Sequence, residues 1–294
     1  MIKSKRKKIL ILNCGYPKAG STYVIESAIN IAPYVNCINI NNNANLLECF
    51  ESILHLKKNE FKNQYKELKL ILSQNLIKDI NFFGYERSLN ITSNSNRKFV
   101  FFKRLKKIAN DLNLDLKLTI FLRDKLEIIE SHYKELYFKL IFKDIKYFFF
   151  SIYIKSILNK KEKNLIKNLD YNYNINKICK IIGKKKVLIN NFENLKKNKK
   201  KTFRELMNFS EIKKFNLNKL TTKSLNSSKN KEFFSLIKLR INDYFFLKKR
   251  LSLKTFTNTI EIFLKLIFFQ NHLNRVVKIN LHSRRELIKL INKN

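Results

Sequence analysis

The chain has 294 residues, of which 45% are hydrophobic and 29% are charged, enough for one large domain or two small ones. This composition excludes a small disulfide-stapled protein and a chain that is disordered throughout. The 61 Lys and Arg residues against 23 Asp and Glu give a formal net charge of +38, which favours an anionic partner such as nucleic acid, acidic lipid, acidic glycan or a phosphate-bearing cofactor.

The first apolar run, Lys8–Asn13, is rich in Ile and Leu and ends at a glycine-containing turn, which predicts a buried strand of a parallel sheet. Gly20–Ile31 repeats its apolar residues at helical spacing and predicts a helix. The same patterns predict, in chain order, strand Val35–Ile40, helices Leu46–Leu56 and Glu60–Ile77, strand Ile80–Tyr85, helix Lys98–Leu112, strand Leu116–Leu122, helices Lys125–Phe142 and Ile175–Ile182, strand Lys186–Ile189 and helix Lys201–Phe209.

Strands that alternate with helices predict an α/β fold with three layers around a central parallel sheet. The segment Asn159–Asn176 is polar and of low complexity, and from Lys231 onward the pattern is helical. We therefore predict an α/β domain over residues 1–230 and a helical C-terminal extension over residues 231–294 that packs on this domain or caps it.

The positive charge is spread along the chain rather than gathered in a tail. Residues 1–210 contain 42 basic and 18 acidic residues, and residues 211–294 contain 19 and 5. A nucleic-acid-binding tail would be more uneven. We expect no specific nucleic-acid partner and only weak, salt-sensitive association with anionic surfaces.

The four cysteines form no CxxC pair, and no histidine stands at zinc-ligand spacing, so we predict reduced thiols, no metal site and a cytoplasmic protein. The apolar run Ile9–Leu12 is too short for a signal peptide. The most apolar later stretches, Tyr137–Ile154 and Phe256–Phe269, contain charges and predict amphipathic core helices rather than transmembrane segments.

Glycine and proline are scarce, with four and two in the chain, yet two glycines and one proline fall within residues 15–20. They lie between a predicted strand and a predicted helix, where the backbone N–H groups of a helix N-terminus bind anions. Gly15 and Gly20 have the spacing of the phosphate loop GxxxxGK[ST], but no lysine follows Gly20. Lys18 precedes it instead, so the most diagnostic residue of a nucleoside triphosphatase is missing.

The segment Tyr16-Pro17-Lys18-Ala19-Gly20-Ser21-Thr22 resembles the 5′-phosphosulfate loop, commonly written YPKSGTT or PKTGTT, of sulfotransferases that use 3′-phosphoadenosine 5′-phosphosulfate. The resemblance implies a P-loop-like α/β fold and assigns these seven residues to cofactor binding. It also implies that Lys18 is catalytic and faces the bridging oxygen of the sulfate being transferred.

A second segment resembles the 3′-phosphate site of the same family. Arg123 ends the predicted strand Leu116–Leu122, and Ser131 follows eight residues later in the next predicted helix. An arginine there can bind a phosphate with two hydrogen bonds. Two weaker similarities are the turn at residues 192–195, which concerns packing, and residues 223–228, which align with a loop that closes on the cofactor.

Transfer to an acceptor hydroxyl or amine needs a group that takes up a proton. Glu86 follows the predicted strand Ile80–Tyr85 and is our first candidate for this general base, because open α/β sheets place their sites at the carboxyl ends of strands. An ion pair with Arg87 or a nearby lysine is the alternative role for Glu86. His55, in a predicted helix, is the second candidate, and His132, directly after Ser131, is the third.

Together these features predict a sulfotransferase that moves a sulfuryl group from 3′-phosphoadenosine 5′-phosphosulfate to a small-molecule or glycan acceptor. Two alternatives stay open. One is a P-loop nucleotide-binding protein of the kinase type. The other is a basic protein that binds nucleic acid or an anionic surface.

Overall fold

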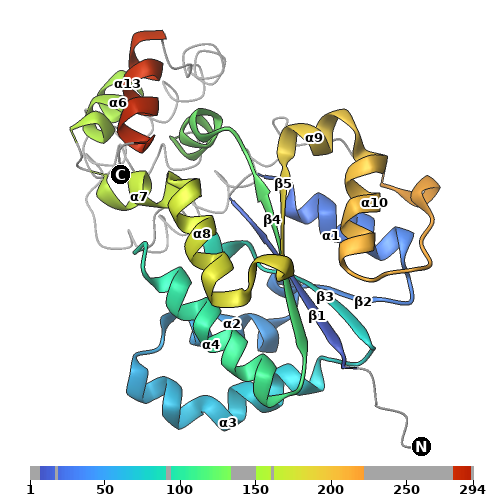
Figure 1. The fold of residues 1–294 in the computed structure, drawn as a ribbon. Coiled ribbons are helices and arrows are strands. Elements are labelled where there is room, and N and C mark those ends of the chain that lie inside the picture. Colours follow the sequence, from blue (N-terminus) through green and yellow to red (C-terminus); the bar gives the residue numbers. More distant parts are fainter. Residues whose placement is uncertain are drawn as a thin grey trace, which may run out of the picture.

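The computed structural model describes residues 7–16, 19–90, 94–133, 150–159, 162–221 and 281–292. Within them, five strands form one all-parallel sheet in the order β2-β3-β1-β4-β5 (Figure 1). The strands are β1 (Ile9–Gly15), β2 (Asn36–Asn39), β3 (Ile80–Gly84), β4 (Asp115–Leu122) and β5 (Val187–Asn191). The predicted α/β class with a central parallel sheet is confirmed.

The central strand β1 is buried along its whole length, as expected for a strand that is covered on both faces and hence apolar throughout. Its partners on the two sides are β3 and β4. Asn13 is paired with Gly84 of β3, and Gly15 with Phe121 of β4. The carboxyl ends of these three strands therefore lie at the same edge of the sheet.

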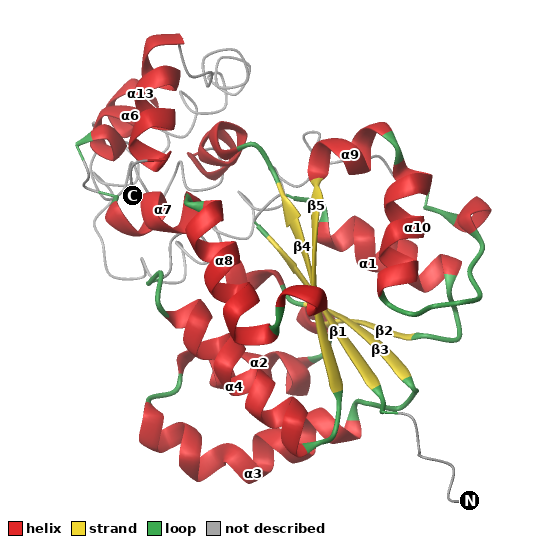
Figure 2. Cartoon of the chain, viewed as in Figure 1, coloured by secondary structure: helices red, strands yellow, loops and turns green. Residues whose placement is uncertain are grey.

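Helices cover both faces of the sheet. In Figure 2 the yellow strands of the sheet lie between two groups of red helices. One face carries α1 (Ser21–Ile31), α9 (Phe192–Lys197) and α10 (Lys199–Phe209), and the other carries α2 (Ala44–His55), α4 (Arg97–Asp111) and α8 (Tyr171–Ile182) (Figure 1). Helix α3 (Lys58–Gln74) packs on α2. Short 3-10 turns are η1 (Ile40–Asn42), η2 (Glu86–Leu89), η4 (Lys184–Lys186) and η5 (Leu217–Lys219).

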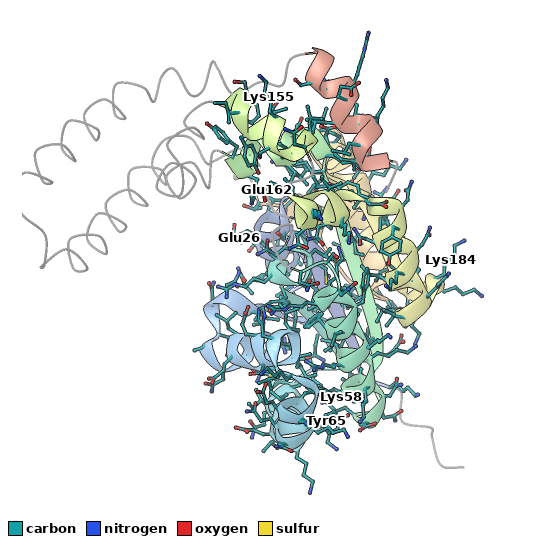
Figure 3. The ribbon with its side chains drawn as sticks, turned by 90° about the vertical axis from the view of Figure 1, so that its left-hand side faces the viewer. Glu26, Lys58, Tyr65, Lys155, Glu162 and Lys184 are labelled. Atoms are coloured by element: carbon teal, nitrogen blue, oxygen red, sulfur yellow. The ribbon has the colours of Figure 1, made fainter. Side chains whose placement is uncertain are left out.

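Three helices form a separate group beside the sheet: α6 (Phe150–Leu158), α7 (Lys163–Leu169) and α13 (Leu281–Asn292). Figure 3 shows Lys155 of α6 at one end of the molecule and Tyr65 of α3 at the opposite end. Leu287 and Ile291 of α13 are fully buried. The last described segment is thus a helix that packs on α6 and α7. Residues 222–280 lie outside the described residues, so the helical extension over residues 231–294 stays a prediction.

The polar segment Asn159–Asn176 contains more structure than its composition indicates. Helix α7 and the first half of α8 lie in it, because Leu165, Ile166 and Leu169 recur at helical spacing and are buried. Low complexity in this chain therefore does not mean the absence of a helix. None of the helices in the described part of the chain is both long enough and apolar enough to span a bilayer.

Candidate active site at the carboxyl edge of the sheet

The chain leaves β1 toward β2 on one side and, after β3, crosses to β4 on the other side of β1. Parallel α/β sheets bind their ligands at such a reversal of strand order, beyond the carboxyl ends of the strands. The loops that follow β1, β3 and β4 all begin there. They contain the predicted phosphate loop, Glu86 and Arg123.

The loop after β1 is held by backbone hydrogen bonds and by a glycine in the left-handed region. Ala19 N–H donates to the carbonyl of Tyr16 at 3.0 Å, and Gly20 has φ 83° as the N-cap residue of α1. A Cβ atom on Gly20 would lie 2.9 Å from Cε2 of Phe192, so both the backbone and the space require glycine. Pro17 and Lys18 lie outside the described residues.

Helix α1 begins at Ser21 with no side-chain cap on its first turn. The first N–H groups of an α-helix have no partner within the helix, and the helix dipole makes this end attractive to anions. The hydroxyls of Ser21 and Thr22 add two further donors at the same point. This donor set fits a phosphate-bearing cofactor.

Glu86 is the predicted base that the structure places against the predicted phosphate loop. It begins η2 directly after β3, and its Oε1 accepts hydrogen bonds from Ser21 Oγ at 2.5 Å and from Thr22 Oγ1 at 3.2 Å. Ser21 is buried and Thr22 is exposed. One carboxylate oxygen therefore occupies both hydroxyl donors at the N-terminus of α1.

Arg123 follows β4 and is mostly buried, with 20% of its side chain exposed. Its Nε lies 2.8 Å from Oε2 of Glu127, and its guanidinium lies over the Phe192 ring, 5.3 Å from the ring centre. The same ring limits the space at Gly20. Phe192 therefore links the phosphate loop to Arg123, and the two predicted cofactor sites are neighbours of one aromatic side chain.

Tyr171 is a site residue that the sequence patterns did not indicate. Its hydroxyl donates to the carbonyl of Arg123 at 2.8 Å, and its ring centre lies 4.5 Å from that of Tyr16. Burial is the main cause that raises the pKa of both phenols. Because the Tyr16 side chain is fully buried, it anchors the loop rather than facing a ligand. No short sequence signal marks Tyr171, since it lies in the polar segment discussed above.

The helix after Arg123 is described over residues 125–133. Asp124 caps it, because its Oδ1 accepts from the N–H groups of Leu126 and Glu127 at 3.0 Å each. Ser131 is half-buried on this helix, about 9 Å along the axis from its first residue at 1.5 Å per residue. Its contact with a phosphate stays a prediction.

The two histidine candidates are engaged elsewhere. His132 Nδ1 lies 3.1 Å from the Tyr153 hydroxyl, and burial lowers the pKa of His132 to about 4, which makes it a weak base. His55 Nε2 lies 3.2 Å from Glu51 Oε2, and its Nδ1 lies 3.1 Å from a guanidinium nitrogen of Arg97. Both nitrogens of the His55 ring are therefore occupied.

Comparisons with known proteins find distant structural similarity. The sequence matches no protein-family model and no curated protein. A sulfotransferase from Alicyclobacillus acidocaldarius superposes with a TM-score of 0.45 and 11% identity, covering 81% of this chain and 92% of the other. The sulfotransferase domain from the curacin biosynthetic pathway superposes with a TM-score of 0.40 and 11% identity, covering 71% of this chain and 75% of the other. The sulfotransferase domain from the Synechococcus PCC 7002 olefin synthase superposes with a TM-score of 0.42 and 13% identity, covering 79% of this chain and 85% of the other. At such values the function proposed below rests on the residues of this chain.

Proposed function

We propose that the protein is a sulfotransferase that uses 3′-phosphoadenosine 5′-phosphosulfate and modifies an acceptor hydroxyl or amine, with a carbohydrate as the preferred acceptor. The observation that carries the proposal is the contact of Glu86 with Ser21 and Thr22. It brings a carboxylate, which can take up a proton, to the anion-binding end of α1. The sequence motif of this loop resembles that of the family, and the contact adds a base beside it.

Each cofactor-binding position has a defined task in this proposal. The loop of residues 16–22 holds the 5′-phosphosulfate through the backbone N–H groups at the start of α1 and the hydroxyls of Ser21 and Thr22, and Arg123 with Ser131 holds the 3′-phosphate. When bound, the cofactor supplies an activated sulfuryl group, whose bond to a phosphate oxygen breaks as a bond to the acceptor forms. Lys18 stabilises the negative charge left on that phosphate oxygen.

Glu86 acts on the acceptor. Its carboxylate takes the proton that the acceptor hydroxyl or amine loses, and its place after β3 keeps it beside the loop that holds the sulfuryl group. Both hydroxyl contacts involve Oε1, so Oε2 can accept the proton of the acceptor while Oε1 keeps its two donors. Phe192 and Tyr171 orient Arg123 and the loop, and neither takes part in proton transfer.

Calorimetry tests the two-site arrangement. The protein should bind 3′,5′-bisphosphoadenosine without magnesium and more tightly than ADP, because ADP lacks the 3′-phosphate that Arg123 would bind. A charge-assisted contact of this kind is worth about 1.5–3 kcal/mol, or roughly 10- to 150-fold in affinity. Equal affinities for the two nucleotides would contradict the assignment of Arg123.

Two substitutions separate binding from chemistry. Arg123→Ala should weaken 3′,5′-bisphosphoadenosine and leave kcat at saturation largely unchanged. Lys18→Ala should mainly lower kcat, because the charge that Lys18 faces develops during transfer. If both variants changed only the affinity for the nucleotide, the catalytic role of Lys18 would be wrong.

A further inference from the structure

A group of polar side chains surrounds Glu51 on α2, next to Glu86. Oε1 of Glu51 accepts from the Tyr85 hydroxyl at 2.9 Å and from Arg87 at 3.1 Å, and its Oε2 lies 3.2 Å from His55 Nε2. Arg97 of α4 lies against the other nitrogen of His55. We call Glu51, His55, Arg87 and Arg97 the Glu51 cluster. Its members come from α2, η2 and α4, so it depends on the tertiary fold.

The hydrogen bonds define the charges in the cluster. A guanidinium only donates, so His55 Nδ1 accepts from Arg97 and His55 Nε2 carries the proton that faces Glu51. This arrangement is that of a neutral imidazole. Arg87 contacts the Glu51 carboxylate and Arg97 contacts His55, so the Glu51 cluster contains two guanidinium groups and one carboxylate, an excess of one positive charge.

The side chains of the Glu51 cluster are also accessible. The side chain of Arg87 is 53% exposed and that of His55 is 43% exposed, whereas Glu51 is 26% exposed, and Arg97 lies on the surface. A guanidinium has five N–H donors, of which the contacts to Glu51 and His55 use one on each arginine. The remaining donors are available to an anionic group that arrives from solvent.

The position of the cluster relates it to the acceptor rather than to the cofactor. Glu86 and Arg87 are consecutive, so their Cα atoms are about 3.8 Å apart. The Glu86 side chain reaches α1, whereas the Arg87 side chain reaches α2. Because Arg87 is the next residue in the chain, an acceptor whose hydroxyl reaches Glu86 lies near at least one member of the Glu51 cluster.

We propose that the Glu51 cluster is an anion-binding subsite for the acceptor, and that the acceptor is an acidic carbohydrate with a carboxylate or sulfate group near the hydroxyl to be modified. Arg87 and Arg97 bind this group, since the planar guanidinium matches the geometry of such oxyanions. This inference rests on the proposed function and adds the chemical class of its substrate.

Binding to matched saccharides tests the subsite directly. The probes are an unsulfated chondroitin oligosaccharide and the same oligosaccharide with its carboxyl groups reduced to alcohols, each titrated calorimetrically into the protein saturated with 3′,5′-bisphosphoadenosine. The wild type should bind the acidic form more tightly. Arg87→Gln and Arg97→Gln should each weaken the acidic form about 3- to 10-fold, a modest effect because the side chains are exposed, and should leave the reduced form unchanged.

Lys184→Gln is the matched control, because it also removes one positive charge. Lys184, labelled in Figure 3, is exposed in η4 just before β5 and hence lies at the amino edge of the sheet, whereas Glu86 follows the carboxyl end of β3. It should bind both saccharides like the wild type. If Lys184→Gln weakened the acidic form as much as Arg87→Gln does, the general positive field would be responsible, and the subsite would be refuted.

Two further outcomes would also refute the subsite. One is equal affinity of the wild type for the acidic and the reduced oligosaccharide, and the other is binding of neither. Thermal unfolding of each variant shows whether the fold is retained, and Arg87→Lys, which keeps the charge without the planar fork, should restore part of the affinity. Failure of the proposed function itself would be visible separately, as the absence of 3′,5′-bisphosphoadenosine binding by the wild type.

Discussion

Replacing Glu86 by glutamine should have opposite effects on nucleotide affinity and on turnover. In the structure, the Glu86 carboxylate occupies the hydroxyl donors of Ser21 and Thr22, which a phosphate would have to take over. Glutamine keeps the size of the side chain but removes its charge. It therefore competes less strongly for these donors and no longer repels an anion.

The magnitude follows from the two contacts. A hydrogen bond to a charged group contributes about 1.5–3 kcal/mol and a neutral one about 1 kcal/mol, so weakening the contact with Ser21 alone should gain about 0.5–2 kcal/mol. The dissociation constant of 3′,5′-bisphosphoadenosine should fall about 2- to 30-fold in Glu86→Gln. In contrast, kcat should fall roughly 10²- to 10⁴-fold, the usual contribution of a general base.

Calorimetry with the nucleotide and an assay of labelled-sulfate transfer measure the two effects. Glu205→Gln is the matched control, because Glu205 is an exposed residue of α10 and its loss should change neither quantity. If Glu86→Gln kept its turnover while His55→Ala or His132→Ala lost most of it, the general base would be a histidine and not Glu86. Weaker nucleotide binding in Glu86→Gln would refute the competition between the carboxylate and a phosphate.

Three further predictions concern the glycine turn, a buried histidine and a thiol. Gly20→Ala should weaken 3′,5′-bisphosphoadenosine, because its Cβ would lie 2.9 Å from Phe192, whereas Gly183→Ala, also at positive φ but with no atom within 4 Å of its Cβ, should cost stability and leave nucleotide affinity unchanged. Burial lowers the pKa of His132 to about 4, so the unfolded chain takes up a proton first as the pH falls below the ordinary value of about 6.5. The free energy of unfolding, measured with denaturant, should therefore drop by about 1–2 kcal/mol more between pH 7 and pH 5 in the wild type than in His132→Asn. Burial raises the pKa of Cys14 to about 12, so its alkylation at pH 8, followed by mass spectrometry, should be at least about 100-fold slower in the native than in the unfolded protein; equal rates would contradict its burial.

Local sequence patterns were sufficient to predict which segments form strands and in which order these strands follow one another along the chain. The apolar runs of β1 and β4 and the helical spacing in α1 are properties of consecutive residues, and the five strands lie within two residues of their predicted limits. The loop between β1 and α1 was equally visible, because glycine and proline are rare in this chain and gather there. Glu86 could be proposed as a site residue because it follows a strand.

The partners of these residues required the tertiary structure. Glu86 meets Ser21 across 65 positions because β3 is the neighbour of β1, and a chain of alternating strands and helices is compatible with several strand orders. Tyr171 supports Arg123 across 48 positions from a segment with no motif. Likewise, Glu51, His55, Arg87 and Arg97 become one cluster only when α2, η2 and α4 pack together. Such contacts depend on which elements are adjacent in space, and the spacing of residues along the chain does not contain that information.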